Sequence, residues 1–388
     1  MERIEEIIGI AKRENNTKRK YLVVNKCQGK HVPVSPERPL KMFSELAEEV
    51  SKRYQKEQLL LIGFAETATA IGETLAIHLG TDYMQTTREK IEDVEYFYFS
   101  ESHSHATEQK VIKNDLDAVI GRIDRIIFVE DEVTTGNTIG KIVHLIRQTY
   151  EKKLRFSVAS LLNGMDEEAR ERYQKEQIEM IYLIKTDHSR YPEIAEKCSN
   201  DGRYYSKFQF SPVCGSVEFT DINPKKAIPE IKEISASGFI NARRLHQGAD
   251  YQAACEKLWQ EIDTRIPFGT DRNILVLGTE EFMYPALYTA WRVEGLGNRV
   301  KCHATTRSPI VVSQNPKYPL HERYELISLY EDDRTTYLYD LARYDLVLIL
   351  TDAKPGKEWG VVSLGRALAA WGNEEIYLVR WCENEKLL

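Results

Sequence analysis

Long apolar runs are missing from this sequence of 388 residues, and none approaches the roughly 18 consecutive residues that a helix needs to cross a bilayer. The first residues, 1–6, also lack the basic start and apolar block of a secretory signal peptide. These two absences predict a soluble, cytoplasmic protein that makes no contact with a membrane.

Paired cysteines and an excess of basic charge are missing as well. The six cysteines are scattered without a Cys-x-x-Cys pair, which argues against a disulfide framework and against a structural zinc site. The chain has 53 Lys and Arg residues against 60 Asp and Glu residues, a net charge of −7. Nonspecific nucleic-acid binding requires the opposite balance. We therefore expect reduced thiols and no nucleic-acid partner.

The composition that is present is that of a globular protein. Hydrophobic residues make up 42% of the chain and charged residues 29%, and the length allows about two domains of roughly 150 to 200 residues each. Short apolar runs such as 59–63 and 125–129 are each followed by a segment with helical periodicity. This alternation predicts an α/β fold with a mostly parallel sheet and flanking helices.

The alternation stops between residues 185 and 234 and then starts again. Strand-like runs return at 273–278, 299–305 and 346–350. We therefore predict a first domain over residues 1–240 and a second α/β domain over residues 241–388.

The most informative segment joins a buried strand to two carboxylates and a loop of hydroxyl groups. Glu130 and Asp131 end the strand, at the sheet edge where ligands of open α/β folds bind. The loop that opens the next helix consists of Thr134, Thr135, Gly136, Asn137 and Thr138. Its glycine, hydroxyls and helix-start amides are suited to phosphate, and the carboxylates to vicinal hydroxyls or magnesium. The sequence thus predicts a site for a phosphorylated ribose.

This segment resembles the signature of the type I phosphoribosyltransferases, which has four apolar residues, two acidic residues, two spacers and Thr-Thr-Gly-x-Thr. The resemblance implies that Glu130 and Asp131 hold magnesium and the ribose hydroxyls of phosphoribosyl pyrophosphate (PRPP). It also implies that residues 134–138 hold the 5-phosphate. The implied reaction transfers the phosphoribosyl group from Mg-PRPP to a nucleobase-like acceptor and releases pyrophosphate, with Mg2+ as cofactor.

Two further segments match the family in order and spacing. Ala65, Glu66 and Thr67 follow the first core strand, in the place of the family's pyrophosphate-binding loop. Arg88 follows the second strand, where these enzymes carry a basic residue, and a guanidinium binds phosphate oxygens in pairs. An ordinary turn and a surface arginine are the alternatives.

A long polar stretch between Tyr98 and Gly121 predicts a lid, since loops of this length are unusual in compact domains. Within it, His103 and His105 are placed to give hydrogen bonds or protons to the departing pyrophosphate. The alternative is a metal site made by Glu101-x-His-x-His, because alternating residues share one face of an extended chain.

Two segments resemble one subgroup, the orotate-phosphoribosyltransferase-like proteins of bacterial tellurium-resistance and stress gene clusters. The first is a basic turn after residues 21–24 with Lys26, Lys30 and His31, which hold base or phosphate or are simply solvated. The second is Thr-Arg-Ser-Pro at 306–309, the signature of the TRSP domain that follows this transferase. The subgroup implies a stress-related role in the synthesis of nucleotide- or nucleoside-like metabolites.

The second half also echoes the first. Residues 275–281, 305–307 and 343–352 resemble 60–66, 86–88 and 122–131 in the same order, so we hypothesise that the second domain is a divergent copy. The copy lacks one carboxylate and the threonines of the phosphate loop, so we expect no second transferase site. The candidate pocket for an anion or nucleotide-like ligand there comprises Glu281, Thr306, Arg307, Ser308 and Asp352.

Two other functions compete with the transferase. A noncatalytic regulator would use the same fold to sense PRPP or a nucleotide. A pyrophosphokinase that makes PRPP would need an ATP site, and the sequence has no Walker loop. Homo-oligomers are common in the family, so the resemblance allows a homo-oligomer, but the sequence identifies neither an interface nor the acceptor base.

Overall fold

The computed structural model describes residues 4–14, 19–99, 109–207 and 229–383. Contacts divide the chain into two compact units with interleaved segments. The β3 unit comprises Leu40–Asp187 and Ile240–Glu256, and the β13 unit comprises Met1–Pro39, His188–Phe239 and Lys257–Leu388. The sequence predicts one domain boundary near residue 240, whereas each of these two units contains segments from both sides of that residue. Within the described ranges, no helix is both long and apolar enough to cross a membrane.

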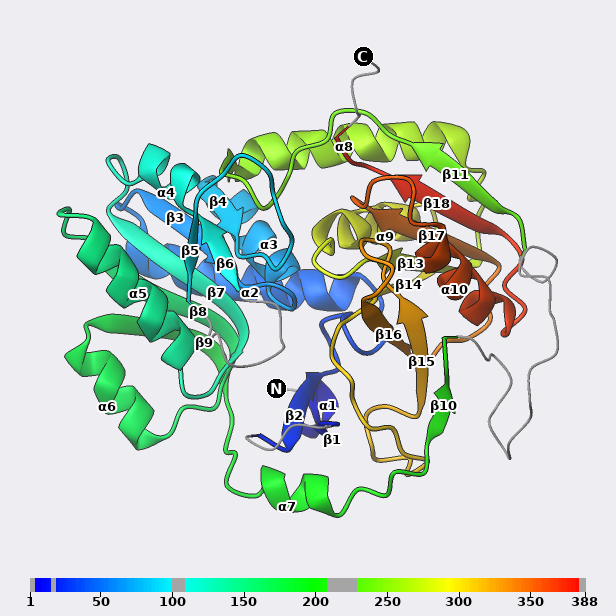
Figure 1. The fold of residues 1–388 in the computed structure, drawn as a ribbon, viewed down its shortest axis with the longest axis horizontal. Coiled ribbons are helices and arrows are strands. Elements are labelled where there is room, and N and C mark those ends of the chain that lie inside the picture. The colour runs from blue at the N-terminus through cyan, green and yellow to red at the C-terminus, as the bar shows by residue number, and fades with distance from the viewer. Residues whose placement is uncertain (1–3, 15–18, 100–108, 208–228, 384–388) are drawn as a thin grey trace. The chain divides into compact units, whose positions relative to one another are not determined.

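The β3 unit is built on a six-stranded sheet in the order β12-β4-β3-β7-β8-β9 (Figure 1). Its strands are β3 (Leu59–Gly63), β4 (Asp82–Gln85), β7 (Arg125–Val133), β8 (Arg155–Asn163), β9 (Ile178–Lys185) and β12 (His246–Gln247). All neighbours are parallel except β12, which runs antiparallel to β4. Every residue of β3 is buried, as expected for a strand covered on both faces.

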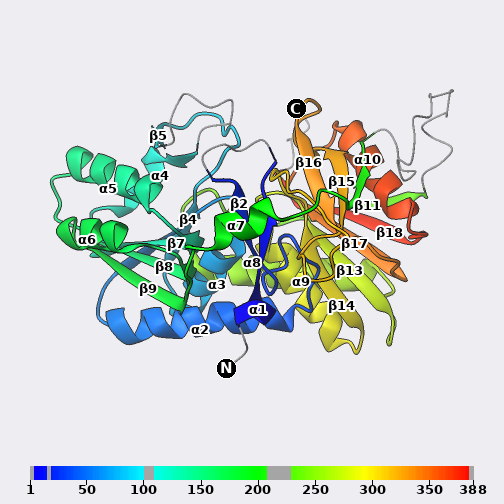
Figure 2. The ribbon, with the colours of Figure 1, turned by 90° about the horizontal axis from the view of Figure 1, so that it is seen from below.

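Helices cover both faces of this sheet. Figure 2 shows α2 and α3 on one face and α5 and α6 on the other. The helices are α2 (Glu37–Tyr54), α3 (Thr69–Leu79), α4 (Lys113–Val119), α5 (Asn137–Thr149) and α6 (Glu167–Lys175). α5 buries Ile139, Ile142, Val143 and Ile146, a spacing that places all four on one side of a helix. The predicted α/β fold is confirmed.

The β13 unit has a five-stranded sheet of its own, in the order β11-β18-β17-β13-β14 with every pair parallel. Its strands are β11 (Ile231–Ser235), β13 (Asn273–Gly278), β14 (Arg299–Ala304), β17 (Leu346–Thr351) and β18 (Ile376–Arg380). The remaining elements of this unit are α1 (Ile4–Ile7), β1 (Ile8–Lys12), β2 (Tyr21–Asn25), α7 (Tyr191–Glu196), β10 (Arg203–Tyr205), α9 (Tyr284–Gly295), β15 (Glu322–Ile327), β16 (Thr335–Tyr339) and α10 (Glu358–Ala369), and α8 (Gly248–Arg265) is divided between the two units. The predicted second α/β domain is confirmed.

The two sheets share one topology. β4-β3-β7-β8 and β14-β13-β17-β18 have the same order, and all their pairs are parallel. Gly63 lies opposite Gln85 and Val129, whereas Gly278 lies opposite Ala304 and Leu350. Counting on from these pairs aligns Arg88 with Arg307 and Asp131 with Asp352, as the sequence echoes do. The common register supports the duplication hypothesis.

The connections after the second strand also correspond. An antiparallel hairpin follows in each unit, β5 (Tyr96–Tyr98) with β6 (Lys110–Ile112) in one and β15 with β16 in the other. Since β6 and α4 lie within residues 110–119, the expectation of one continuous loop from Tyr98 to Gly121 is wrong. Only residues 99–109 separate β5 from β6, because residues 110–112 already pair with β5.

Candidate active site

The end of β7 carries three consecutive carboxylates, Glu130, Asp131 and Glu132, after five buried residues. All three are half-buried. Burial raises the pKa of Glu130 well above its usual range, and the negative charge of Asp131 raises it further. Asp131 Oδ1 accepts a hydrogen bond of 2.8 Å from Thr67 Oγ1. A cluster of this kind can receive a cation or the hydroxyl groups of a sugar.

The hydroxyl loop follows directly and opens α5. Gly136 is the N-cap of this helix and has a φ of 67°, a left-handed conformation that glycine adopts without strain. A Cβ at this position would lie 2.2 Å from Tyr173 Oη. Thr135, Asn137 and Thr138 are exposed. Hydroxyls and a helix start are therefore presented together, an arrangement suited to phosphate.

Two residues of α6 support this loop. Arg172 donates a hydrogen bond to the carbonyl of Thr135, and Tyr173 Oη donates to the carbonyl of Gly136 over 3.0 Å. Both side chains reach the loop, although no motif in the sequence marks them.

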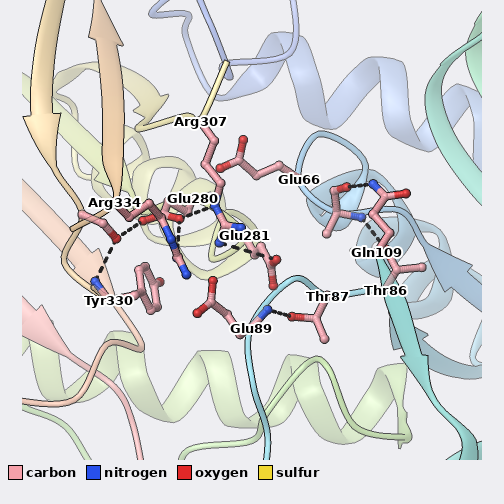
Figure 3. A network of polar contacts seen from close by, with 12 residues as sticks. Glu66, Thr86, Thr87, Glu89, Gln109, Glu280, Glu281, Arg307, Tyr330 and Arg334 are labelled. Atoms are coloured by element: carbon pink, nitrogen blue, oxygen red, sulfur yellow. Dashed lines mark hydrogen bonds and ion pairs between the residues drawn. The ribbon is translucent and has the colours of Figure 1, made fainter. Parts of the chain in front are cut away.

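The turn after β3 contains the predicted pyrophosphate loop. The Ala65 amide donates to Thr86 Oγ1 over 2.9 Å, and Gln109 Nε2 donates to the Ala65 carbonyl over 2.8 Å (Figure 3). Glu66 is buried, and the Ala65–Glu66 peptide is cis. Thr67 joins this turn to Asp131 at the end of β7. The loop and the acidic strand end thus form one continuous site.

Arg88 lies close enough to the acidic end of β7 for its positive charge to lower the pKa of Glu130, which partly offsets the effect of burial. Among the described residues no three His, Cys, Asp or Glu side chains form a metal-binding group. His103 and His105, and with them the Glu101 metal alternative, lie outside the described residues. Gln109 was not singled out in the sequence, where it looks like an ordinary polar loop residue.

The N-terminal basic turn belongs to the β13 unit. Lys26 Nζ donates to the Glu5 carbonyl over 2.9 Å. Lys30 is fully buried, and its Nζ donates to the carbonyls of Glu280 and Thr305 over 2.7 and 2.9 Å. Burial and the charge of Lys30 lower the pKa of His31 to about 3, so this histidine is neutral. The alternative that these charges are simply solvated is wrong for Lys30 and His31.

The pocket residues suggested for the second domain lie at the matching edge of the β13 sheet. Thr306 pairs through its backbone with Tyr337, and the Ser308 amide donates to Thr306 Oγ1 over 3.3 Å. Asp352 accepts a 2.5 Å hydrogen bond from Tyr330 Oη. Glu281 is buried, with one oxygen 3.9 Å from a terminal nitrogen of Arg307.

Two family models match this chain, one after the other. Residues 7–188 match a family model described as phosphoribosyl transferase. Residues 242–364 match the model of the TRSP domain that lies C-terminal to that transferase domain. A search of the curated proteins found no match.

Solved phosphoribosyltransferases resemble about half of the chain. Adenine phosphoribosyltransferase from Trypanosoma brucei is 14% identical, covering 48% of this chain and 78% of its own, with a TM-score of 0.34. The enzyme from Thermoanaerobacter pseudethanolicus is 17% identical, with coverages of 47% and 98% and a TM-score of 0.34. Orotate phosphoribosyltransferase from Aeropyrum pernix is 15% identical, with coverages of 50% and 93% and a TM-score of 0.31.

The two family matches occur in the order expected from the Thr-Thr-Gly-x-Thr and Thr-Arg-Ser-Pro segments. The chain thus contains a region that matches the phosphoribosyl transferase family and, C-terminal to it, a region that matches the TRSP domain.

Proposed function

We propose that the β3 unit transfers a phosphoribosyl group from Mg-PRPP to a ring nitrogen of a nucleobase-like acceptor. In this reaction the bond between C1 of the ribose and the pyrophosphate oxygen breaks, and a bond from C1 to the acceptor nitrogen forms. The acceptor gives up its proton and pyrophosphate leaves. The observation that carries the proposal is the direct succession of the acidic end of β7, the hydroxyl loop and α5.

Each part of the site has a task in this reaction. Thr134, Thr135 and Thr138, with the start of α5, hold the 5-phosphate. Glu130 and Asp131 hold the ribose hydroxyls, so that C1 faces the acceptor. Arg88 and the loop of residues 65–67 bind the leaving pyrophosphate, and His103 and His105 are proposed to assist its departure. Orientation and fixed charges supply the catalysis, and no covalent nucleophile is needed.

The carboxylates at the end of β7 have the chemistry of magnesium ligands, although they do not by themselves form a three-ligand group among the described residues. Three neighbouring carboxylates raise the local negative charge, which is one reason why the pKa of Glu130 is high. Carboxylate oxygens are the ligands that this hard cation prefers. We propose that Glu130 and Asp131 hold it together with PRPP. When bound, magnesium neutralises charge on the pyrophosphate group.

The test is incubation of the full chain with Mg2+, PRPP and a panel of nucleobases while pyrophosphate release is followed. We expect turnover with at least one base. Asp131→Asn should reduce this turnover about a hundredfold or more, the usual cost of one preorganised electrostatic contact.

The matched control is Asp117→Asn, which makes the same chemical change at a partly exposed residue of α4. This variant should keep its turnover, and equal rates for both variants would refute the assigned role of Asp131. Tight PRPP binding without turnover on any base would instead support the noncatalytic sensor. The stress-related role and an oligomeric state stay predictions.

A further inference from the structure

The turns after β3 and β13 share two hydrogen bonds, although their side chains differ at Phe64 and Thr279, at Ala65 and Glu280, and at Thr67 and Phe282. The Ala65 amide donates to Thr86 Oγ1 over 2.9 Å, and the Glu280 amide donates to Thr305 Oγ1 over 3.0 Å. The Thr86 and Thr305 amides donate in turn to the carbonyls of Gly63 and Gly278. Glu280 therefore occupies the position of Ala65, and a carboxylate replaces a methyl group.

That carboxylate is surrounded by donors of its own unit. Glu280 is 2% exposed, and Oε2 accepts from Arg307 Nε over 2.5 Å and from Arg334 Nη1 over 3.0 Å (Figure 3). Ser328 Oγ donates to Oε1. The side chains of both arginines are nearly buried. One carboxylate thus receives two guanidinium groups and a hydroxyl.

The same donor set suits a phosphate group. Guanidinium groups bind phosphate and carboxylate oxygens through the same charge-assisted hydrogen bonds. Arg307 is also the register equivalent of Arg88, which we assign to pyrophosphate in the β3 unit. Lys30 holds the backbone of the turn after β13 in place, because its buried ammonium donates hydrogen bonds to the carbonyls of Glu280 and Thr305.

We propose that the β13 unit contains an anion site of the phosphate type, which the chain fills with its own Glu280 carboxylate. Glu280 is then the specificity-determining residue that keeps pyrophosphate and phosphorylated sugars out of this unit. A ligand of the β13 sheet edge has to lack a phosphate at this position. The proposal concerns the β13 unit alone and does not require transfer activity in the β3 unit.

The test removes the internal carboxylate and offers inorganic pyrophosphate to the full chain. Glu280→Ala reproduces the residue found at the equivalent position of the β3 unit. We expect titration calorimetry to show one more pyrophosphate site per chain in this variant than in the wild type. Pyrophosphate should also raise its melting temperature by more than it raises that of the wild type.

Three variants locate and control the gained site. Adding Arg307→Ala to Glu280→Ala should abolish it, whereas adding Arg88→Ala should not. Glu331→Ala is the matched control, since Glu331 is a more exposed carboxylate that binds the other terminal nitrogen of Arg334 over 2.8 Å. It should create no pyrophosphate site. Absence of pyrophosphate binding by the wild type would count against the proposed function but not against this proposal.

A folded Glu280→Ala variant that binds pyrophosphate no better than the wild type would overturn the proposal. Glu280→Gln keeps the shape of the side chain without its charge, and should gain weaker binding of the same kind if Glu280→Ala does not fold. A second measurement uses the otherwise native chain. Arg307→Ala alone should leave pyrophosphate affinity unchanged, and a loss of affinity there would show that the native site is open.

Discussion

Gly136 is subject to two constraints, a left-handed backbone and contact with Tyr173. Gly136→Ala should lower the free energy of unfolding by about 1 to 2 kcal/mol for the backbone alone, and by more because a Cβ would lie 2.2 Å from Tyr173 Oη. The displaced loop should also raise the KM for PRPP. Urea unfolding and initial rates measure the two effects.

Gly80 provides the matched control for this substitution. Its φ is 63°, but a Cβ added there would have no atom within 4 Å. Gly80→Ala should therefore show only the backbone cost and an unchanged KM. An equal loss of stability in both variants would mean that the Tyr173 contact imposes no constraint.

His246 and Glu73 form a buried pair that makes the stability of the β3 unit depend on pH. His246 Nε2 lies 3.1 and 3.2 Å from the two carboxylate oxygens of Glu73. Burial by itself lowers the pKa of His246, but the charge and the hydrogen bond of Glu73, together with the Arg244 carbonyl and the charge of Asp250, outweigh it and raise the pKa from 6.5. A raised pKa means that the folded state binds the proton more tightly. The stabilisation is complete below pH 6.5 and is lost as the pH rises through the folded pKa.

Unfolding in urea between pH 6 and pH 9 measures this dependence. At pH 6, His246→Gln should lower the free energy of unfolding by about 3 kcal/mol, the scale of removing one partner of a buried pair. The variant should also lose the decline that the wild type shows at higher pH. His78→Gln changes an exposed histidine of α3, the helix that carries Glu73, and should keep that decline. A decline of equal size in all three proteins would contradict the assignment to His246.

At the scale of elements, the segment that carries β12 is held to α4 by a single carboxylate. Asp115 accepts two hydrogen bonds of 2.8 Å from Arg244 and one of 2.8 Å from the Leu245 amide. Asp115→Asn should destabilise the β3 unit by about 2 kcal/mol, the scale of hydrogen bonds to a charged group. Faster amide hydrogen exchange in β12 and β4 would report the release of this segment.

Asp117→Asn serves as the control in this experiment, two residues later in the same helix. Asp117 pairs with Lys113 at the surface, and exposed pairs of this kind contribute about 0 to 1 kcal/mol. Its substitution should leave exchange in β12 unchanged. If Asp115→Asn behaves in the same way, the Arg244 pair does not hold the segment.

The elements that the sequence predicts well are the buried parallel strands. The predicted runs 59–63 and 273–278 coincide with β3 and β13, because a strand covered on both faces must be apolar throughout. Short hairpin strands are harder to predict. β6 has three residues and begins with Lys110, so its pairing with β5 depends on contacts that no local pattern contains.

The same distinction applies to the candidate site. Glu130, Asp131 and the hydroxyl loop are adjacent in sequence, so one motif marks them all. Arg172, Tyr173 and Gln109 reach the site from separate elements, and only the tertiary fold brings them there. The burial of Lys30 was unpredictable for a related reason, since its partners are backbone carbonyls, which every residue has.

At the scale of the whole molecule, buried thiols can report the opening of each unit. Cys255 lies in the β3 unit and Cys302 in the β13 unit, and both are buried. Burial raises the pKa of Cys302 to about 12 and that of Cys255 well above its usual range. A buried thiol with little thiolate reacts slowly. In the native protein we expect iodoacetamide to modify the half-buried Cys198 before either of them.

Mass spectrometry of the labelled peptides measures these rates at increasing urea concentrations. Modification of Cys255 should follow unfolding of the β3 unit, and modification of Cys302 that of the β13 unit. If either residue reacted as fast as Cys198 in the absence of urea, its unit would open far more readily than its packing implies.

Because segments of the two units are interleaved along the chain, neither of the two regions matched by family models corresponds to one complete unit. The TRSP match begins at residue 242, yet residues 240–256 supply the β3 unit with β12 and with the partners of Glu73 and Asp115. The transferase match includes residues 8–25, although β1 and β2 belong to the β13 unit. Each matched region therefore includes a segment that belongs to the other unit. A gene exchange that moved one region without the other would leave a sheet or core incomplete in both units.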